Sequence, residues 1–134
     1  MTHTPKHSPA DLTRFASSLL AAAGMPQDKA DTVARLLVLT DMMQRHTHGV
    51  ALCPLYIDQL QKNLMGDGGE PEVVRDTGST VVWDGHYLPG LWLVDKALGM
   101  AFERVAQHGV VTFAMRRSHH IACLAALVKH CLLY

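Results

Sequence analysis

The chain has 134 residues, of which 49% are hydrophobic and 18% are charged, and its twelve basic residues balance twelve acidic ones. That length and composition suit one globular domain, or one small domain and part of a second. The balanced charge provides no electrostatic footprint for nucleic acid or for an anionic membrane, and no apolar run approaches the roughly 20 residues of a membrane span. Three cysteines without paired spacing and an N-terminus without the apolar core of a signal peptide predict a cytoplasmic protein.

The first 65 residues carry the apolar spacing of helices. Ser8 and Pro9 are typical of a helix start, and Gly24 is typical of a helix end. We expect a second helix from Pro26 and a third from about Pro54. The apolar residues that recur at helical spacing are Leu12, Phe15, Leu19, Leu20 and Ala23, then Ala30, Val33, Leu36 and Leu37, then Tyr56, Leu60 and Leu64. The sequence therefore predicts a helical N-terminal unit of three helices over residues 1–65.

The pattern changes after the glycine-rich segment 66–71, which is typical of a loop. Residues 73–74 and 80–83 are short β-branched or aromatic runs that predict strands. A long amphipathic helix is expected over residues 94–105, ending before Gly109.

The next segment, VVTFAM at residues 110–115, predicts an apolar strand of the kind that is buried on both faces. A strand, a helix and a strand at this spacing predict a right-handed parallel crossover. Residues 122–134 are expected to form a final apolar helix. The predicted fold class is thus α/β (α+β), with residues 66–134 as the first part of an α/β cofactor and substrate domain. So few strands leave a sheet edge unpaired, and we expect the chain to be the N-terminal part of a larger protein.

His48 is the first candidate for chemistry. It follows a predicted helix and precedes Gly49, which lets the backbone turn away and leaves the imidazole accessible. An accessible imidazole exchanges protons near neutrality, as a general acid or base must. The competing interpretation is a histidine at a helix C-terminus that interacts with free carbonyl groups.

His119 and His120 form a second cluster, directly after the predicted buried strand. In open α/β sheets, ligands bind beyond the carboxyl ends of the strands, which favours a functional role. The alternative is a solvated loop. Arg116 and Arg117 could likewise meet an anion or be solvated.

A metal site is a third hypothesis, and the sequence argues against it. The available ligands are His46, His48, His119, His120, Cys53, Cys123 and Cys131. Their spacing matches no zinc signature, and the cysteines lie in apolar segments, where buried structural thiols are common. We therefore predict no metal. The chain also lacks a GxGxxG fingerprint and a GxxxxGK loop.

Three motifs occur in a characteristic order. The segment DMMQRHTHGVALCPLY contains Asp41, then Thr47-His48-Gly49, and then Tyr56. It is followed by GEPEVVRDTGSTVVWDG and by QHGVVTFAMRRSHH. In this series the chain resembles the malate/L-lactate dehydrogenase family of the type without an ordinary Rossmann fold, which includes ureidoglycolate dehydrogenase and diketogulonate reductase. The resemblance runs from about Asp11 to Val128.

The resemblance implies catalytic roles for His48 and His120 and substrate-binding roles for Thr47 and Tyr56. It implies an NAD(P)-dependent oxidoreductase that interconverts a 2-hydroxy acid, or a related CH–OH or imine compound, and its 2-oxo form. The cofactor would be NAD or NADP, with most of its site beyond Tyr134, so we expect this chain alone to be inactive. Family members are dimers, so a homodimer that binds a small-molecule substrate is expected.

Two positions depart from the family pattern. Leu52 stands where many members carry an arginine that meets the substrate carboxylate, and leucine cannot replace that bidentate contact. Ala122 stands in place of a common glycine. With these departures a simple malate-like or lactate-like substrate is not expected. An alternative of another class also stays open: a truncated, non-catalytic helical module for interaction or dimerisation.

Overall fold

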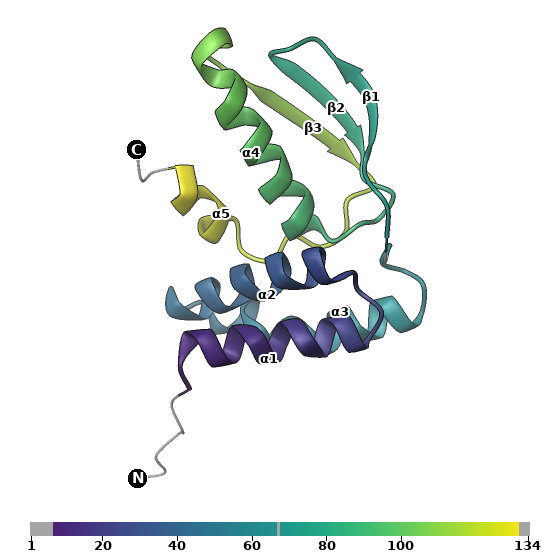
Figure 1. The fold of residues 1–134 in the computed structure, drawn as a ribbon, viewed down its shortest axis with the longest axis vertical. Coiled ribbons are helices and arrows are strands. Elements are labelled where there is room, and N and C mark those ends of the chain that lie inside the picture. The colour runs from purple at the N-terminus through teal and green to yellow at the C-terminus, as the bar shows by residue number, and fades with distance from the viewer. Residues whose placement is uncertain (1–6, 67, 132–134) are drawn as a thin grey trace.

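The structure is a computed structural model that describes residues 7–66 and 68–131 (Figure 1). The elements are α1 (Pro9–Ala22), α2 (Gln27–Met42), the 3₁₀ turns η1 (His46–His48) and η2 (Val50–Leu52), α3 (Cys53–Gln61), β1 (Glu72–Asp76), β2 (Thr80–Asp84), α4 (Gly90–His108), β3 (Thr112–Arg116) and α5 (Leu124–Cys131). The α/β (α+β) fold class is confirmed. None of the helices within these residues is long and apolar enough to cross a membrane.

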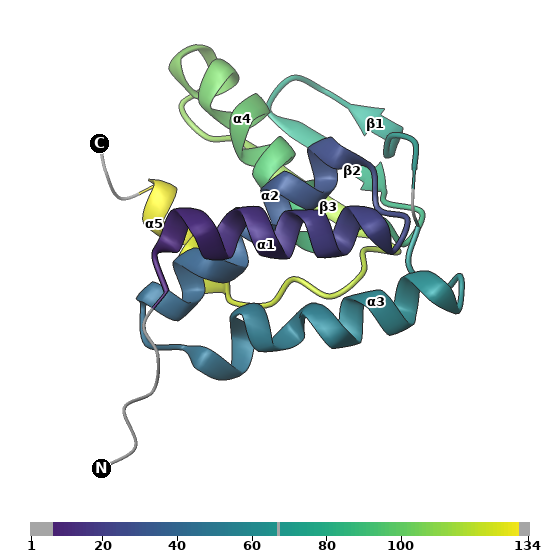
Figure 2. The same ribbon diagram turned by 60° about the horizontal axis from the view of Figure 1, so that its bottom comes forward.

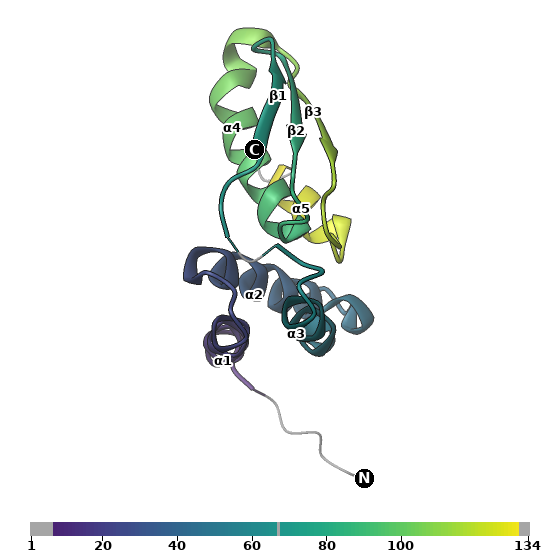
Figure 3. The same cartoon turned by 90° about the vertical axis from the view of Figure 1, so that its right-hand side faces the viewer.

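The helical layer consists of α1, α2 and α3, with α2 between the other two helices and the sheet layer (Figure 3). The Ser8 side chain caps α1 by accepting from the Asp11 backbone N–H at 3.1 Å. The buried stripe of α1 contains Leu20, but Phe15, which shares the predicted periodicity, is 62% exposed. The third predicted helix was expected to include Leu64, but α3 ends at Gln61, so Leu64 lies beyond it. The apolar periodicity predicted where these helices lie, but it did not predict which of their apolar side chains would be buried.

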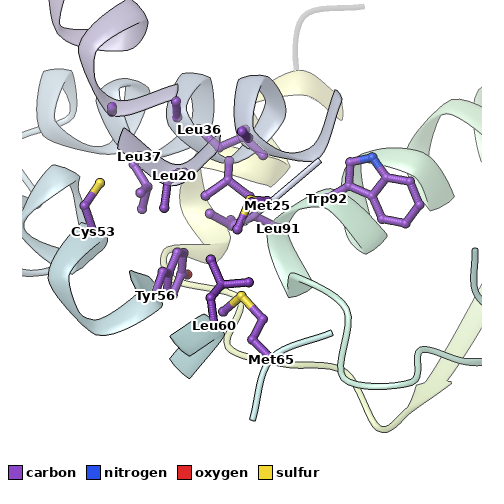
Figure 4. Close-up of a cluster of buried hydrophobic side chains, with 14 of the residues drawn as sticks. Leu20, Met25, Leu36, Leu37, Cys53, Tyr56, Leu60, Met65, Leu91 and Trp92 are labelled. Carbon is purple, nitrogen blue, oxygen red and sulfur yellow. The ribbon is translucent and has the colours of Figure 1, made fainter. Parts of the chain in front are cut away.

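A single apolar core joins the helical layer to the first turns of α4 (Figure 4). The residues predicted for the buried face of the second helix all lie in this core: Ala30, Val33, Leu36 and Leu37. Tyr56 and Leu60 of α3 pack from one side, and Leu91 of α4 packs from another. The core therefore connects α3, which carries Tyr56, to α4, the helix between β2 and β3.

The sheet has the order β1-β2-β3. β1 pairs with β2 antiparallel, and β2 pairs with β3 in parallel from Thr80 opposite Thr112 to Asp84 opposite Arg116. The predicted parallel crossover is confirmed, with α4 as its helix. α4 covers the face that carries Val81 and Trp83.

The prediction that β3 is buried on both faces is wrong. Phe113 and Met115 are half-buried on the α4 side, whereas Thr112, Ala114 and Arg116 are exposed. β3 is an edge strand in the described part of the chain, so only alternate residues meet a packed layer. The final helix is shorter than residues 122–134, since α5 begins at Leu124, and residues 132–134 lie outside the described residues.

Candidate active site

Segments distant in sequence meet at Tyr56. The loop between β3 and α5 passes beside α3 (Figure 2). Tyr56 is 1% exposed, and its hydroxyl oxygen lies 3.2 Å from Nδ1 of His120 and 3.4 Å from the His120 carbonyl oxygen. The Tyr56 ring makes edge contacts with the His119 and His120 rings, with centroids 6.3 and 6.0 Å apart. The structure thus joins Tyr56 and His120, two residues that the sequence analysis had singled out separately.

His48 belongs to the same region. It ends η1 with an exposed side chain, and its Nδ1 lies 2.9 Å from Thr47 Oγ1. Burial lowers the pKa of His120, and the charge of His48 lowers it further. The two histidines are therefore within electrostatic range of each other, as a shared site requires. Their catalytic roles stay a prediction.

Asp41, near the end of α2, holds the turn that carries His48. Its carboxylate accepts from the Val50 backbone N–H at 2.8 Å and lies 3.1 Å from Nδ1 of His46. A Cβ at Gly49 would overlap this carboxylate. The φ of Gly49 is −92°, so glycine is needed here for the close approach of Asp41 and not for a left-handed backbone. In the sequence, Asp41 is recognisable only as part of a motif, and its contacts with Val50 and Gly49 become visible only in the structure.

A buried carboxylate, Asp84, joins the end of β2 to the segment that leads to His120. Asp84 accepts from Nε of Arg116 at 2.7 Å and from Nε and Nη2 of Arg117, both at 2.7 Å. Its fourth donor is the His86 backbone N–H at 3.1 Å. The Arg117 guanidinium, above all, holds the pKa of Asp84 well below its usual range. Arg116 and Arg117 are thus both paired with Asp84, although both side chains remain exposed to solvent.

Backbone hydrogen bonds reinforce this connection. Tyr87 N–H donates to the Arg117 carbonyl at 2.6 Å, and His119 N–H donates to the Leu88 carbonyl at 3.1 Å. A Cβ at Gly90 would overlap the His119 carbonyl oxygen, so glycine at this position allows the loop to pack directly on the start of α4. The loop that carries His120 is consequently held along its length.

His119 differs from its neighbour. Its Nδ1 is buried and has no hydrogen-bond partner among the described residues. Burial lowers the pKa of His119, and the adjacent His120 adds to the effect. The described residues contain no group of three or more His, Cys, Asp or Glu side chains arranged to hold a metal ion. Cys53 is buried, which raises the pKa of its thiol to about 11, with a further contribution from Asp41.

The two phosphates of a nicotinamide nucleotide require basic side chains or clustered backbone N–H groups. The two arginines that begin the His120 loop, Arg116 and Arg117, are already paired with Asp84. The rings of His48 and His120 and the hydroxyl of Thr47 are exposed polar groups suited to the oxygen of a small substrate, whereas the Tyr56 hydroxyl is buried against His120.

Comparisons with known proteins agree with the motif series. Residues 7–132 match the family model described as malate/L-lactate dehydrogenase. The L-lactate dehydrogenase of Cupriavidus necator is 35% identical over 108 residues, which are 81% of this chain and 31% of that protein. The L-sulfolactate dehydrogenase of Methanothermobacter thermautotrophicus is 26% identical over 113 residues, which are 84% of this chain and 33% of that protein.

Solved structures share the fold. The malate dehydrogenase from Pyrococcus horikoshii superposes with a TM-score of 0.89 at 21% identity, covering 94% of this chain and 36% of that one. The sulfolactate dehydrogenase from Methanocaldococcus jannaschii gives a TM-score of 0.86 at 23% identity, covering 92% and 36%. The chain spans about a third of the length of the curated relatives it matches. It belongs to the malate/L-lactate dehydrogenase family.

Proposed function

We propose that this chain contributes the proton-handling half of the substrate site in an NAD(P)-dependent oxidoreductase that interconverts a 2-hydroxy acid and its 2-oxo form. The contact between Tyr56 Oη and His120 Nδ1, with His48 in electrostatic range, carries the proposal. The names of relatives support the substrate class: they include L-lactate dehydrogenase, L-sulfolactate dehydrogenase, hydroxycarboxylate dehydrogenase B and 2,3-diketo-L-gulonate reductase.

The chemistry divides between the cofactor and this chain. NAD or NADP would supply or receive the hydride, held mainly by residues outside this chain. His48 and His120 handle the substrate oxygen, whose charge changes as hydride arrives or leaves. Tyr56 holds the His120 ring in place, and Thr47 holds the His48 ring.

The substrate is expected to differ from simple malate or lactate. Leu52, where many relatives carry arginine, is half-buried and packs against the apolar core. An apolar side chain cannot bind a carboxylate in the bidentate way of a guanidinium. A less usual 2-oxo or 2-hydroxy compound, or a related imine, is therefore the proposed substrate.

A cytoplasmic homodimer is the proposed assembly. On α5, Leu124 is 60% exposed and Val128 is 48% exposed, and large apolar side chains exposed together mark interaction surfaces. The same observation favours the second candidate function, a non-catalytic dimerisation module. Activity separates the two.

The test uses the polypeptide encoded by the uninterrupted reading frame that contains residues 1–134. We expect it to reduce a panel of 2-oxo acids with NADH or NADPH, and His48→Ala and His120→Ala to lower kcat by about 100-fold or more. His7→Ala, which removes an exposed histidine outside the site, should leave kcat unchanged. Full activity in both site variants would refute the proposed roles, and no turnover with a stable dimer would favour the dimerisation module.

A further inference from the structure

Three non-glycine residues with a left-handed backbone meet where the segment after β2 contacts the segment after β3. His86 and Tyr87 lie just after β2, with φ of +47° and +59°, and Arg117 lies just after β3, with a φ of +51°. This conformation is unfavourable for residues with a Cβ, and it persists where the surrounding structure holds it. Tyr87 N–H donates to the Arg117 carbonyl at 2.6 Å, so the two left-handed segments are bonded directly to each other.

Asp84 holds both of these segments. Its side chain is fully buried, and its carboxylate accepts from the His86 backbone N–H at 3.1 Å, in the segment after β2. The same carboxylate accepts from Nε and Nη2 of Arg117, both at 2.7 Å, in the segment after β3. A bidentate, charge-assisted contact of this kind fixes the orientation of a guanidinium as well as its distance. One carboxylate therefore fixes the place of the left-handed residues on both sides of the contact.

The loop that carries His120 begins at this contact. Arg117 precedes His120 by three residues, and the intervening His119 N–H donates to the Leu88 carbonyl at 3.1 Å. At the other end of the segment, Nδ1 of His120 lies 3.2 Å from the buried Tyr56 hydroxyl. The loop is thus fixed by the buried carboxylate at its start and by Tyr56 at His120, and a shift at Arg117 would move the His120 ring relative to Tyr56.

We propose that Asp84 is a positioning residue for the substrate site: acting through Arg117, it sets the place of the loop and hence of the His120 ring. This proposal rests on the proposed function. Because Asp84 is fully buried, it touches neither substrate nor cofactor and can affect turnover only through the residues that it holds. A displacement of about 1 Å in an active site can cost on the order of 100-fold in rate. Loss of the Asp84 charge should therefore lower kcat and leave KM nearly unchanged.

A second ion pair in the same sheet provides a matched control. Asp76, the last residue of β1, accepts from Nη1 and Nη2 of Arg104, both at 2.8 Å. Asp76 pairs with Val81 near the start of β2, whereas Asp84 is the last residue of β2. The two ion pairs have the same bidentate chemistry and lie at opposite ends of β2. Only the Asp84 pair is bonded to the loop of the candidate site.

Hydrogen exchange, followed by mass spectrometry at neutral pH, tests the structural step without any activity. In Asp84→Asn, amides of residues 85–88 and 117–121 should exchange about 10-fold or more faster, while amides of residues 30–40 in α2 report any change in global stability. Asp76→Asn should leave the first two segments unchanged and speed exchange at the turn between β1 and β2. Unchanged exchange of residues 117–121 in a folded Asp84→Asn variant would overturn the proposal.

Steady-state kinetics of the active polypeptide test whether this contact serves the site. Under conditions where urea unfolding shows each variant to be folded, Asp84→Asn should lower kcat by about 10-fold or more and change KM by less than about 2-fold. Asp76→Asn should retain the kcat of the unsubstituted polypeptide. A normal kcat in Asp84→Asn, together with faster exchange of the loop, would show a purely structural role and overturn the proposal.

Variants of Arg117 keep the test decisive if Asp84→Asn does not fold. Arg117→Met removes the same bidentate contact and should reproduce the loss of kcat. Arg117→Lys retains a charge that can reach Asp84 and should recover part of the loss. Equal kcat values for the Met variant and the unsubstituted polypeptide would overturn the proposal. If the unsubstituted polypeptide turns over no substrate, the proposed function is rejected instead, and hydrogen exchange still decides whether Asp84 fixes the loop.

Discussion

The carboxylate of Asp41 occupies the space that a side chain at Gly49 would need. Asp41 lies on α2, and the backbone that it binds begins η2, so this contact links the long central helix to the turn that carries His48. The glycine of the Thr-His-Gly motif is therefore explained by a steric requirement, and the aspartate of the motif by the hydrogen bond that fills the space.

Gly49→Ala should destabilise the chain by about 1–3 kcal/mol, because the added methyl group must displace the Asp41 carboxylate. Urea unfolding measures the change. Gly99→Ala is the matched control: it lies inside α4, nothing would touch its Cβ, and it should stabilise by about 0.5–1 kcal/mol. Equal effects of the two substitutions would contradict the role given to Asp41.

Ala122→Gly should stabilise the chain, by about 0.5 kcal/mol, because Ala122 has a left-handed backbone in which a Cβ is unfavourable. The gain is partly offset by the greater flexibility of glycine in the unfolded chain. Ala125→Gly, at an exposed position of α5, should instead cost about 1 kcal/mol. The free energies of unfolding of the two variants should thus differ in sign.

Leu37→Ala should cost about 2–5 kcal/mol, because Leu37 is fully buried in the core that joins α2 to α3 and α4. Leu55→Ala removes the same atoms from a side chain that is 43% exposed, and it should change stability by less than about 1 kcal/mol. The same urea midpoint for both variants would contradict the burial of Leu37 in this core.

Asp84 should make the stability of the chain dependent on acid pH. Its pKa in the folded chain is lowered, chiefly by Arg117, so its contribution is complete above the unfolded pKa of about 3.9 and is lost as the pH falls through the folded pKa. The difference in free energy of unfolding between the unsubstituted chain and Asp84→Asn should therefore stay constant from neutral pH to about pH 5 and shrink in stronger acid. Chemical unfolding over this range measures it. Glu103→Gln, at an exposed carboxylate on α4, should show no comparable loss, and a flat difference for Asp84→Asn would contradict the ion pairs.

Much of the fold was predictable because its signals are local. Capping by Ser8, the apolar periodicity of α2 and the order of strand, helix and strand each depend on neighbouring residues, and the structure bears them out. The position of the His120 loop beyond a parallel strand follows from the same order. The family resemblance also followed from short motifs, and it is confirmed over residues 7–132.

The sequence by itself determined which segments form helices and strands and which residues carry imidazoles and hydroxyls. It could not determine which apolar faces are covered, because periodicity predicts which side chains share a face but not which element packs on that face. Phe15 and the outer face of β3 are exposed because no other described element packs on them. Only the tertiary structure brought Tyr56 to Nδ1 of His120 and Asp84 to Arg117. These contacts join segments far apart along the chain, and they form because the shared core and the parallel strand pair bring those segments to the same place.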